Sequence, residues 1–139
     1  MRKLVVLFVL AVGAATLLGA CSGSGSGSGL TGKTWKWTAS TTTVPASQNV
    51  VPDPENYTIE FKSDGTFSAK ADCNQLSGTY TTTSSGGLTI VPGPMTLAIC
   101  GDASLDTLFV AGLTATQSYT LANNQLTTKQ ADEATMTFS

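Results

Sequence analysis

Apolar and polar side chains alternate through much of this chain, in short segments that turn-forming residues separate. In one such segment Tyr57, Ile59 and Phe61 fall on the same face of an extended strand. Ser63-Asp64-Gly65 follows as a turn, because glycine accepts the positive φ that a tight hairpin needs. One-sided apolar strands joined by short turns are typical of antiparallel sheets. We therefore expect a mainly antiparallel β fold, as a small β-barrel-like structure or a curved meander sheet.

Other segments have the same alternating pattern. Strands are predicted around residues 35–37, 57–61, 66–71, 78–81, 88–91, 119–121, 126–129 and 136–138. Proline cannot donate to a strand ladder, so Pro92 and Pro94 are expected to end the strand at 88–91. The segment from Ala39 to Pro54 has three prolines and no periodicity, and we expect a long loop there.

One segment has the helical period instead. Within Ser104 to Ala115, five apolar or small residues recur at i, i+3, i+4, i+7 and i+8, namely Leu105, Leu108, Phe109, Gly112 and Leu113. This spacing predicts one short α-helix around 104–115, with Asp102 or Ser104 as its N-cap. The predicted fold is α+β, leaning towards all-β.

The first twenty residues have the three-part layout of a bacterial export signal. Arg2 and Lys3 precede an uncharged apolar run that is shorter than the ~20 residues of a membrane-spanning helix. Leu-Leu-Gly-Ala then precedes Cys21 and resembles the lipobox of bacterial lipoproteins. The resemblance implies cleavage of residues 1–20 and diacylglyceryl modification of the Cys21 thiol. The alternative is an ordinary secretory signal with a cysteine nearby.

Residues 21–29 are expected to form a tether between the lipid and the domain at 30–139. From Ser22 to Gly29, Ser and Gly alternate strictly, a composition that behaves as a flexible coil. Two or more acyl chains are enough for stable membrane anchoring. We expect a location in the cell envelope, outside the cytoplasm. Because Ser22 rather than Asp follows Cys21, the outer membrane is favoured if the organism has one.

The charge pattern argues against nucleic acid as a partner. The whole chain has a net charge of −2, and removal of Arg2 and Lys3 makes the remainder more acidic. Lysine is then the only basic residue type, and no basic cluster is present to neutralise phosphates. The expected partners are the membrane, through the lipid at Cys21, and an envelope protein, and we expect a monomer.

Two cysteines remain after Cys21 is used for the lipid. In an oxidising compartment Cys73 and Cys100 are expected to form a structural disulfide. A metal or redox site is the alternative. A redox site favours close spacing, and zinc favours further Cys or His ligands, whereas this chain has no histidine. We predict neither a metal nor any other cofactor.

Several motifs occur in a recognisable order along residues 30–138. They are Leu30-Thr31-Gly32-Lys33-Thr34-Trp35, Ile59-Glu60-Phe61 before Asp64-Gly65, Cys73-Asn74 with Gly78 and Tyr80, and Thr96 to Cys100 before the predicted helix. This order resembles the META domain of the HslJ-like family of small bacterial envelope proteins. The matching motif residues are Trp35, Asn74, Gly78 and Tyr80. The resemblance implies a compact antiparallel β fold with one helix, a role in envelope or stress physiology, and no catalytic residues.

Two positions depart from the family pattern. Asp72 stands where glycine usually precedes the first cysteine, and Ala98-Ile99 replaces the usual Met-Ala before the second. The backbone conformation at Asp72 is therefore left open by the resemblance.

The sequence favours a non-catalytic function. After signal removal the chain has no His and no Arg, so the commonest general base and the usual oxyanion clamp are missing. Asp64, Asp53 and Glu55 are interpreted as turn or solvated residues. The favoured hypothesis is an envelope lipoprotein that binds or stabilises another envelope component under stress.

Two alternatives stay open. One is a secreted inhibitor of a hydrolase, such as a protease or lysozyme, that inserts the loop from Val44 to Pro54 into an active site. The other is a small barrel-like cup for an apolar ligand, with Trp35, Trp37 and Tyr80 near its mouth.

Overall fold

The computed structural model describes residues 29–139. Its strands are β1 (Thr34–Thr43), β2 (Ala46–Val50), β3 (Tyr57–Phe61), β4 (Thr66–Ala71), β5 (Asn74–Thr82), β6 (Leu88–Met95), β7 (Thr116–Ala122), β8 (Gln125–Gln130) and β9 (Thr135–Phe138). The helix α1 spans Asp106–Ala115, and a 3₁₀ turn, η1, covers Pro54–Asn56. The predicted signal peptide, Cys21 and the tether up to residue 28 lie outside the described residues. Within 29–139, no helix is long and apolar enough to span a membrane.

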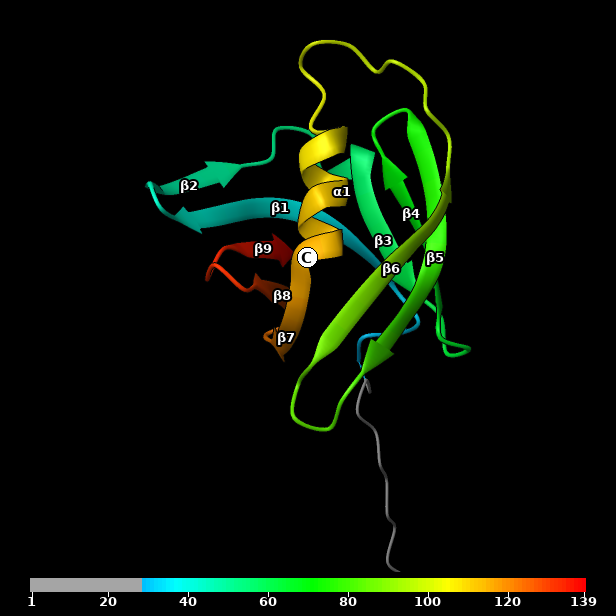
Figure 1. Ribbon diagram of the computed structural model, residues 1–139, viewed down its shortest axis with the longest axis vertical. Coiled ribbons are helices and arrows are strands. Elements are labelled where there is room, and N and C mark those ends of the chain that lie inside the picture. Colours follow the sequence, from blue (N-terminus) through cyan, green and yellow to red (C-terminus); the bar gives the residue numbers. More distant parts are fainter. Residues whose placement is uncertain (1–28) are drawn as a thin grey trace, which may run out of the picture.

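The strands form one antiparallel sheet that curls into a half-barrel (Figure 1). Its order is β6-β5-β4-β3-β1-β9-β8-β7, and β2 pairs with β1 outside this path. The two ends of the order approach each other where Gly87 forms an isolated bridge with Ser118 of β7. The Tyr119 amide also donates to Gly86 O at 2.9 Å. The predicted antiparallel β fold with one helix is confirmed.

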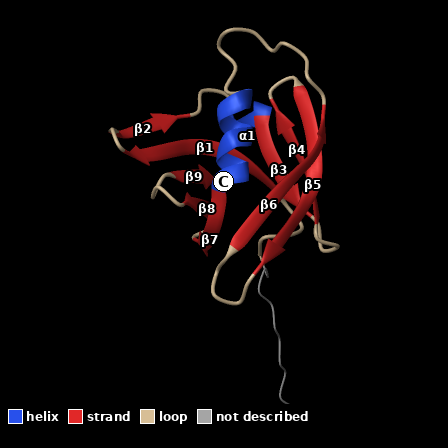
Figure 2. Cartoon of the chain, in the orientation of Figure 1, coloured by secondary structure: helices blue, strands red, loops and turns tan. Residues whose placement is uncertain are grey.

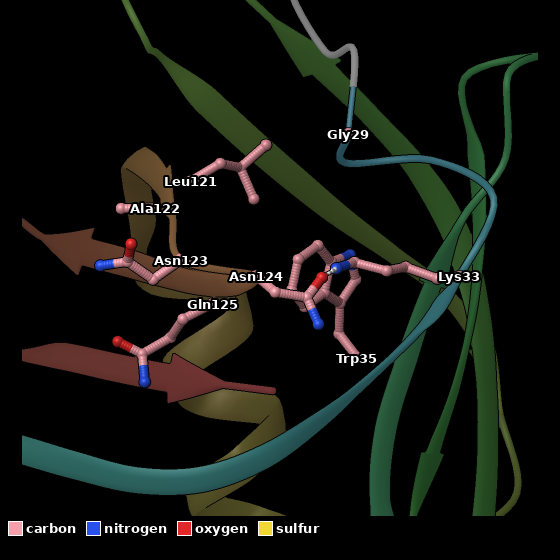
Figure 3. Close-up of a pocket in the computed structure, with 8 residues that line it drawn as sticks. All are labelled: Gly29, Lys33, Trp35, Leu121, Ala122, Asn123, Asn124 and Gln125. Carbon is pink, nitrogen blue, oxygen red and sulfur yellow. Dashed lines mark hydrogen bonds between the residues drawn. The ribbon is translucent and has the colours of Figure 1, made fainter.

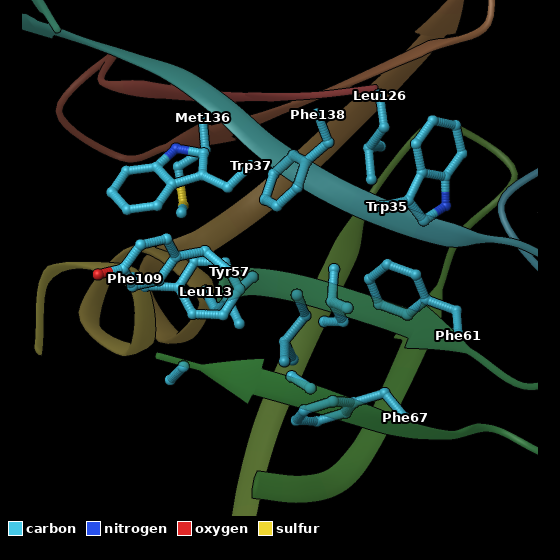
Figure 4. Close-up of a cluster of buried hydrophobic side chains, with 14 of the residues drawn as sticks. Trp35, Trp37, Tyr57, Phe61, Phe67, Phe109, Leu113, Leu126, Met136 and Phe138 are labelled. Carbon is cyan, nitrogen blue, oxygen red and sulfur yellow. The ribbon is translucent and has the colours of Figure 1, made fainter. Parts of the chain in front are cut away.

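The apolar faces of the strands enclose a single core against α1 (Figure 4). Buried positions alternate along β3 and β4 as predicted, with Ile59, Phe61 and Phe67 almost fully covered. From the helix, the Phe109 ring lies 5.6 Å from the ring of Trp37, measured between centroids. The interior of the half-barrel is therefore occupied by large side chains.

The helix begins two residues later than expected and has a different N-terminus. Leu105 occupies the N-cap position and its side chain makes no capping bond, while its amide donates to the Tyr57 hydroxyl at 2.8 Å. Ser104 Oγ accepts from the Asp106 amide at 3.2 Å, and Asp102 takes no capping role. Of the predicted apolar stripe, Phe109, Gly112 and Leu113 are buried, whereas Leu108 is exposed. The helix therefore covers the core with a narrower face than the spacing suggests.

The predicted long loop at 39–54 is wrong. β1 continues to Thr43, β2 returns from Ala46 to Val50, and η1 follows, so most of this segment is a hairpin (Figure 2). We call residues 39–50 the β1–β2 arm. Its residues are exposed or only partly buried, so no apolar face imposes an alternating pattern on them. Alternation of apolar and polar residues arises where one face of a strand is buried, so the pattern is absent where neither face is buried.

The prolines of β6 do not end that strand, contrary to expectation. β6 runs through Pro92 and Pro94 to Met95 and pairs with β5, with an irregularity in the register between Pro92 and Met95. β6 lies at one end of the strand order, and an edge strand tolerates residues that cannot donate to a further neighbour.

Candidate functional site

A disulfide bond joins the corner between β4 and β5 to the loop after β6. The sulfur atoms of Cys73 and Cys100 are 2.00 Å apart and their Cα atoms 5.5 Å apart. The expected pair is thus formed in the structure. A bonded pair offers no thiolate to a metal or a substrate.

The side-chain amide of Asn74 holds the same loop. Asn74 is 1% exposed, and its Oδ1 accepts from Ala98 N at 2.8 Å and Thr96 Oγ1 at 3.1 Å. Its Nδ2 donates to Ala98 O at 3.0 Å and also reaches Cys100 Sγ and Asp106 Oδ2, each at 3.3 Å. The buried side-chain amide of Asn74 therefore supplies hydrogen bonds that the loop after β6 does not receive from strand pairing. We call Asn74, the disulfide and residues 96–100 the loop clamp.

Asp72 adopts the conformation that favours glycine. Its φ is +58°, and its amide donates to Asn56 O at 2.7 Å. Among residues with a Cβ, Asp and Asn enter this left-handed region most readily. The departure from the family pattern thus leaves the turn intact.

The remaining motif residues have clear packing roles. Trp35 is fully buried, and its indole Nε1 donates to Leu30 O at 2.8 Å. A Cβ on Gly78 would lie only 2.2 Å from Val91 O, so β5 and β6 cross there without room for a side chain. The Tyr80 hydroxyl donates to Lys62 O at 2.7 Å, and burial raises the pKa of its phenol.

Charged side chains do not gather into an acid–base site. Asp64 is a turn residue: its carboxylate accepts from Thr66 Oγ1 at 2.6 Å and Thr66 N at 2.9 Å, and these bonds lower its pKa. Glu55 forms an exposed ion pair with Lys36 at 2.6 Å. No cluster of three potential metal ligands occurs in the described part of the chain.

The three aromatic residues expected near the mouth of a ligand-binding cup do not lie around one common opening. Trp35 lines a pocket of about 220 Å³ that Lys33 and Asn124 border, with Lys33 Nζ 3.7 Å from a Trp35 ring centroid (Figure 3). Trp37 lines a separate groove, and the Tyr80 ring packs on Phe61, with centroids 4.8 Å apart.

Two large apolar side chains are almost fully exposed in the clamped loop. Leu97 is 86% exposed and Ile99 is 98% exposed, and they flank Ala98, whose N and O both bond to Asn74. Their loop lies at one end of the long axis, opposite the end where Gly29 begins the described chain (Figure 1). Neither residue is predicted as a site residue from the sequence. The available signal was their alternation around Ala98 outside any predicted strand.

A groove of about 380 Å³ runs between α1 and the strands β1, β2 and β9. Trp37 and Met136 line it from the sheet, Leu108 from the helix and Asn49 from the β1–β2 arm. Asp132 is the only charged residue among the described residues that line it. The groove is therefore mostly apolar, with one carboxylate.

The comparisons with known proteins were consistent with this geometry. The family model of the META domain matches residues 28–139. No curated protein matches the chain.

Solved structures share the fold at low sequence identity. A DUF4847 family protein from Bacteroides vulgatus has a TM-score of 0.61 and 15% identity, covering 76% of this chain and 90% of its own. A protein from Burkholderia xenovorans also has a TM-score of 0.61, with 18% identity, covering 79% of this chain and 82% of its own. At these identities the likeness concerns the fold alone.

Proposed function

This chain belongs to the META domain family, and we propose that it is a lipid-anchored, non-catalytic protein of the bacterial envelope. In this proposal its domain binds another envelope protein during a stress response. The observation that carries the binding role is the exposure of Leu97 and Ile99 on the clamped loop.

Exposed apolar side chains on a stiff backbone are suited to protein recognition. Burying apolar surface contributes about 25 cal/mol per Å², and Leu97 and Ile99 contribute almost none of this to folding. The Asn74 bonds to Ala98 fix the backbone between them at both its N–H and its C=O. A partner that covers these side chains therefore has little loop entropy to overcome.

The position of the loop fits an anchored protein. Seven residues lie between Cys21 and Gly29, so eight residue steps of at most about 3.6 Å each keep the domain within roughly 30 Å of the lipid. The described chain begins near one end of the long axis, and the loop between β6 and α1 lies at the other (Figure 1). An anchor at the first end leaves the second free to meet a partner beyond the membrane surface.

Site-specific photo-crosslinking in the exporting bacterium tests the binding role. A photo-reactive residue at position 97 or 99 should give one discrete crosslinked product. The same residue at Gln125, which is exposed near the opposite end, is the matched control and should not. Identical products from all three positions, or none from 97 and 99, would contradict the proposal.

Mass spectrometry of the intact mature protein tests the anchor. We expect a chain that starts at Cys21 and carries diacylglyceryl and acyl groups. A Cys21→Ser variant should be released from the membrane fraction. An unmodified Cys21, or a mature chain that starts elsewhere, would refute lipid anchoring while leaving the loop-binding test valid.

A hydrolase inhibitor is the second candidate, because the tip of the β1–β2 arm projects one apolar side chain. Val44 lies at the turn of the hairpin and is 91% exposed. Deleting 44–54 is a poor test, since Val51 is buried in the core. Val44→Asp should keep the fold, because the side chain is exposed, and it should abolish inhibition of a protease or lysozyme if the tip enters an active site. Inhibition that survives in Val44→Asp would reject the tip as the inhibitory element.

A further inference from the structure

The β1–β2 arm combines an open strand edge with an uncharged sequence. Within the described chain, β2 pairs only with β1, so its outer edge keeps backbone N–H and C=O groups without a strand partner. Residues 39–52 contain no ionisable side chain. Natural edge strands are commonly protected from pairing by lysine, proline or a bulge. Between Ala46 and Val50, β2 contains neither a charge nor a proline.

The groove described above adjoins this edge. Asn49 of β2 and Leu108 of α1 line it together, so the arm forms one wall and the helix another. A strand added beside β2 directs alternate side chains to the groove side of the sheet. Leu108, 63% exposed, lies where such a side chain would enter. The edge and the groove therefore form one continuous surface.

Asp132 gives this surface its charge preference. Its Oδ1 accepts from the Ala134 amide at 3.1 Å, and its backbone O accepts from Thr43 Oγ1 at 2.8 Å. These bonds place one carboxylate among uncharged groove residues on the β9 side of β1, across the groove from β2. A basic side chain on an incoming strand is complementary to it, and an acidic one is repelled.

We propose that the outer edge of β2 and the adjoining groove bind an extended peptide segment of another protein by strand addition. The segment is uncharged except for one Lys or Arg whose long side chain extends along the groove towards Asp132, and it places one apolar side chain against Leu108. Main-chain hydrogen bonds to β2 supply affinity, and the groove supplies specificity. This site is separate from the Leu97–Ile99 loop and does not depend on the function proposed for that loop.

A second copy of the chain is the weaker occupant. β2 has five residues, about 17 Å of edge, and a two-fold pairing of β2 with itself joins only the two arms. Stable dimers bury about 1,200–2,000 Å² in total. A peptide segment can instead follow the edge and fill the groove at the same time.

Selection from a phage library of random dodecapeptides, with the mature lipidated protein in detergent as the target, tests this inference. Enriched peptides should alternate β-forming uncharged residues with one apolar anchor and one Lys or Arg. The Ser47→Lys/Asn49→Lys variant should bind them at least tenfold more weakly, and Asp132→Asn should remove the preference for a basic residue. Gln117→Lys/Gln125→Lys adds the same charge at exposed positions of β7 and β8 and should bind as the wild type does.

Three results would overturn the inference. The first is that no peptide is enriched. The second is that enriched peptides bind the Ser47→Lys/Asn49→Lys variant as tightly as the wild type. The third is that the wild type sediments as a dimer and this variant sediments as a monomer. The third result would assign the edge to a second copy. Ser47 and Asn49 are exposed, so each variant should melt at the same temperature as the wild type. An unchanged melting temperature shows that a loss of peptide binding does not come from unfolding.

Discussion

The loop clamp and the β1–β2 arm are built on opposite principles. At the clamp, both polar atoms of the buried Asn74 amide are bonded and a disulfide joins the two segments. In the arm, neither face is covered, and the exposed residues are mainly Thr, Ser, Asn and Val. Both regions present apolar side chains to solvent, Leu97 and Ile99 from the clamp and Val44 and Val50 from the arm.

The difference indicates two ways to keep a surface available for binding. The clamp fixes the backbone that carries Leu97 and Ile99, so recognition there depends on the fixed shape that these side chains present. The arm leaves backbone hydrogen-bonding groups open, so recognition there depends on strand pairing. Substitutions should therefore affect stability strongly at the clamp and weakly at the arm.

Removal of the disulfide should have the largest effect. The bond closes a loop of 27 residues, and the chain-entropy estimate for that length is about 3.5 kcal/mol. We expect the Cys73→Ala/Cys100→Ala variant to lose about that much in the free energy of unfolding, measured by urea denaturation. A loss below about 1 kcal/mol would show that the Asn74 bonds hold the loop without the disulfide.

Asn74→Ala should lower the free energy of unfolding by about 2–3 kcal/mol, because it leaves loop polar groups without their partners. Asn74→Asp is the informative control, since it keeps the acceptor for Ala98 N but places a carboxylate near Asp106. Denaturation of both variants checks this. Equal stability of Asn74→Ala and the wild type would mean that solvent replaces the amide fully.

Thr128→Val should raise the free energy of unfolding by about 1 kcal/mol. Thr128 on β8 is fully buried, and its Oγ1 is the only buried side-chain polar atom without a partner among residues 29–139. Valine has a similar shape and removes the desolvated hydroxyl. Thermal unfolding against the wild type measures the change, and a destabilised variant would indicate a water bound to the hydroxyl.

Asp72→Gly, at the turn between β4 and β5, should raise the free energy of unfolding by about 0.5 kcal/mol. Glycine relieves the strain of φ +58°, but part of this gain is offset by its greater freedom in the unfolded chain. Asp72→Ala, which keeps the strain without the favourable Asp preference, should be destabilised instead. Chemical denaturation of the pair gives the sign, and the same sign for both would exclude the backbone explanation.

Gln48→Lys in the arm should change the free energy of unfolding by less than about 0.5 kcal/mol. Gln48 is exposed on β2, as is every other residue of this strand. Thermal melting checks the value, with Gln125→Lys as a matched exposed control. A loss comparable to that of Asn74→Ala would remove the contrast between the two regions.

The sequence predicts a strand correctly where one face of that strand is buried, and less well where neither face is. The apolar faces of β3 and β4 were predicted correctly because one side of each strand is covered and alternation records that. The sequence predicts a loop for the arm because neither side of the arm is covered, and it predicts too early an end for β6 because the position of β6 at the edge of the sheet depends on the fold. The motif residues Asn74, Gly78 and Tyr80 were found from the family resemblance, but their bonds were not. Leu97 and Ile99 are not predicted as site residues, since their alternation around Ala98 does not by itself reveal that both side chains are exposed.

By itself, the sequence determined the antiparallel β class, the single helix, the apolar face of each covered strand and the two cysteines available for pairing. These follow from local periods and residue chemistry, which act over a few neighbouring positions. Only the tertiary structure decided that the sheet curls until Gly87 meets Ser118, that Asn74 reaches the loop at 96–100 and that β2 keeps an open edge. These features depend on contacts between segments far apart in the chain, and no local pattern records such contacts.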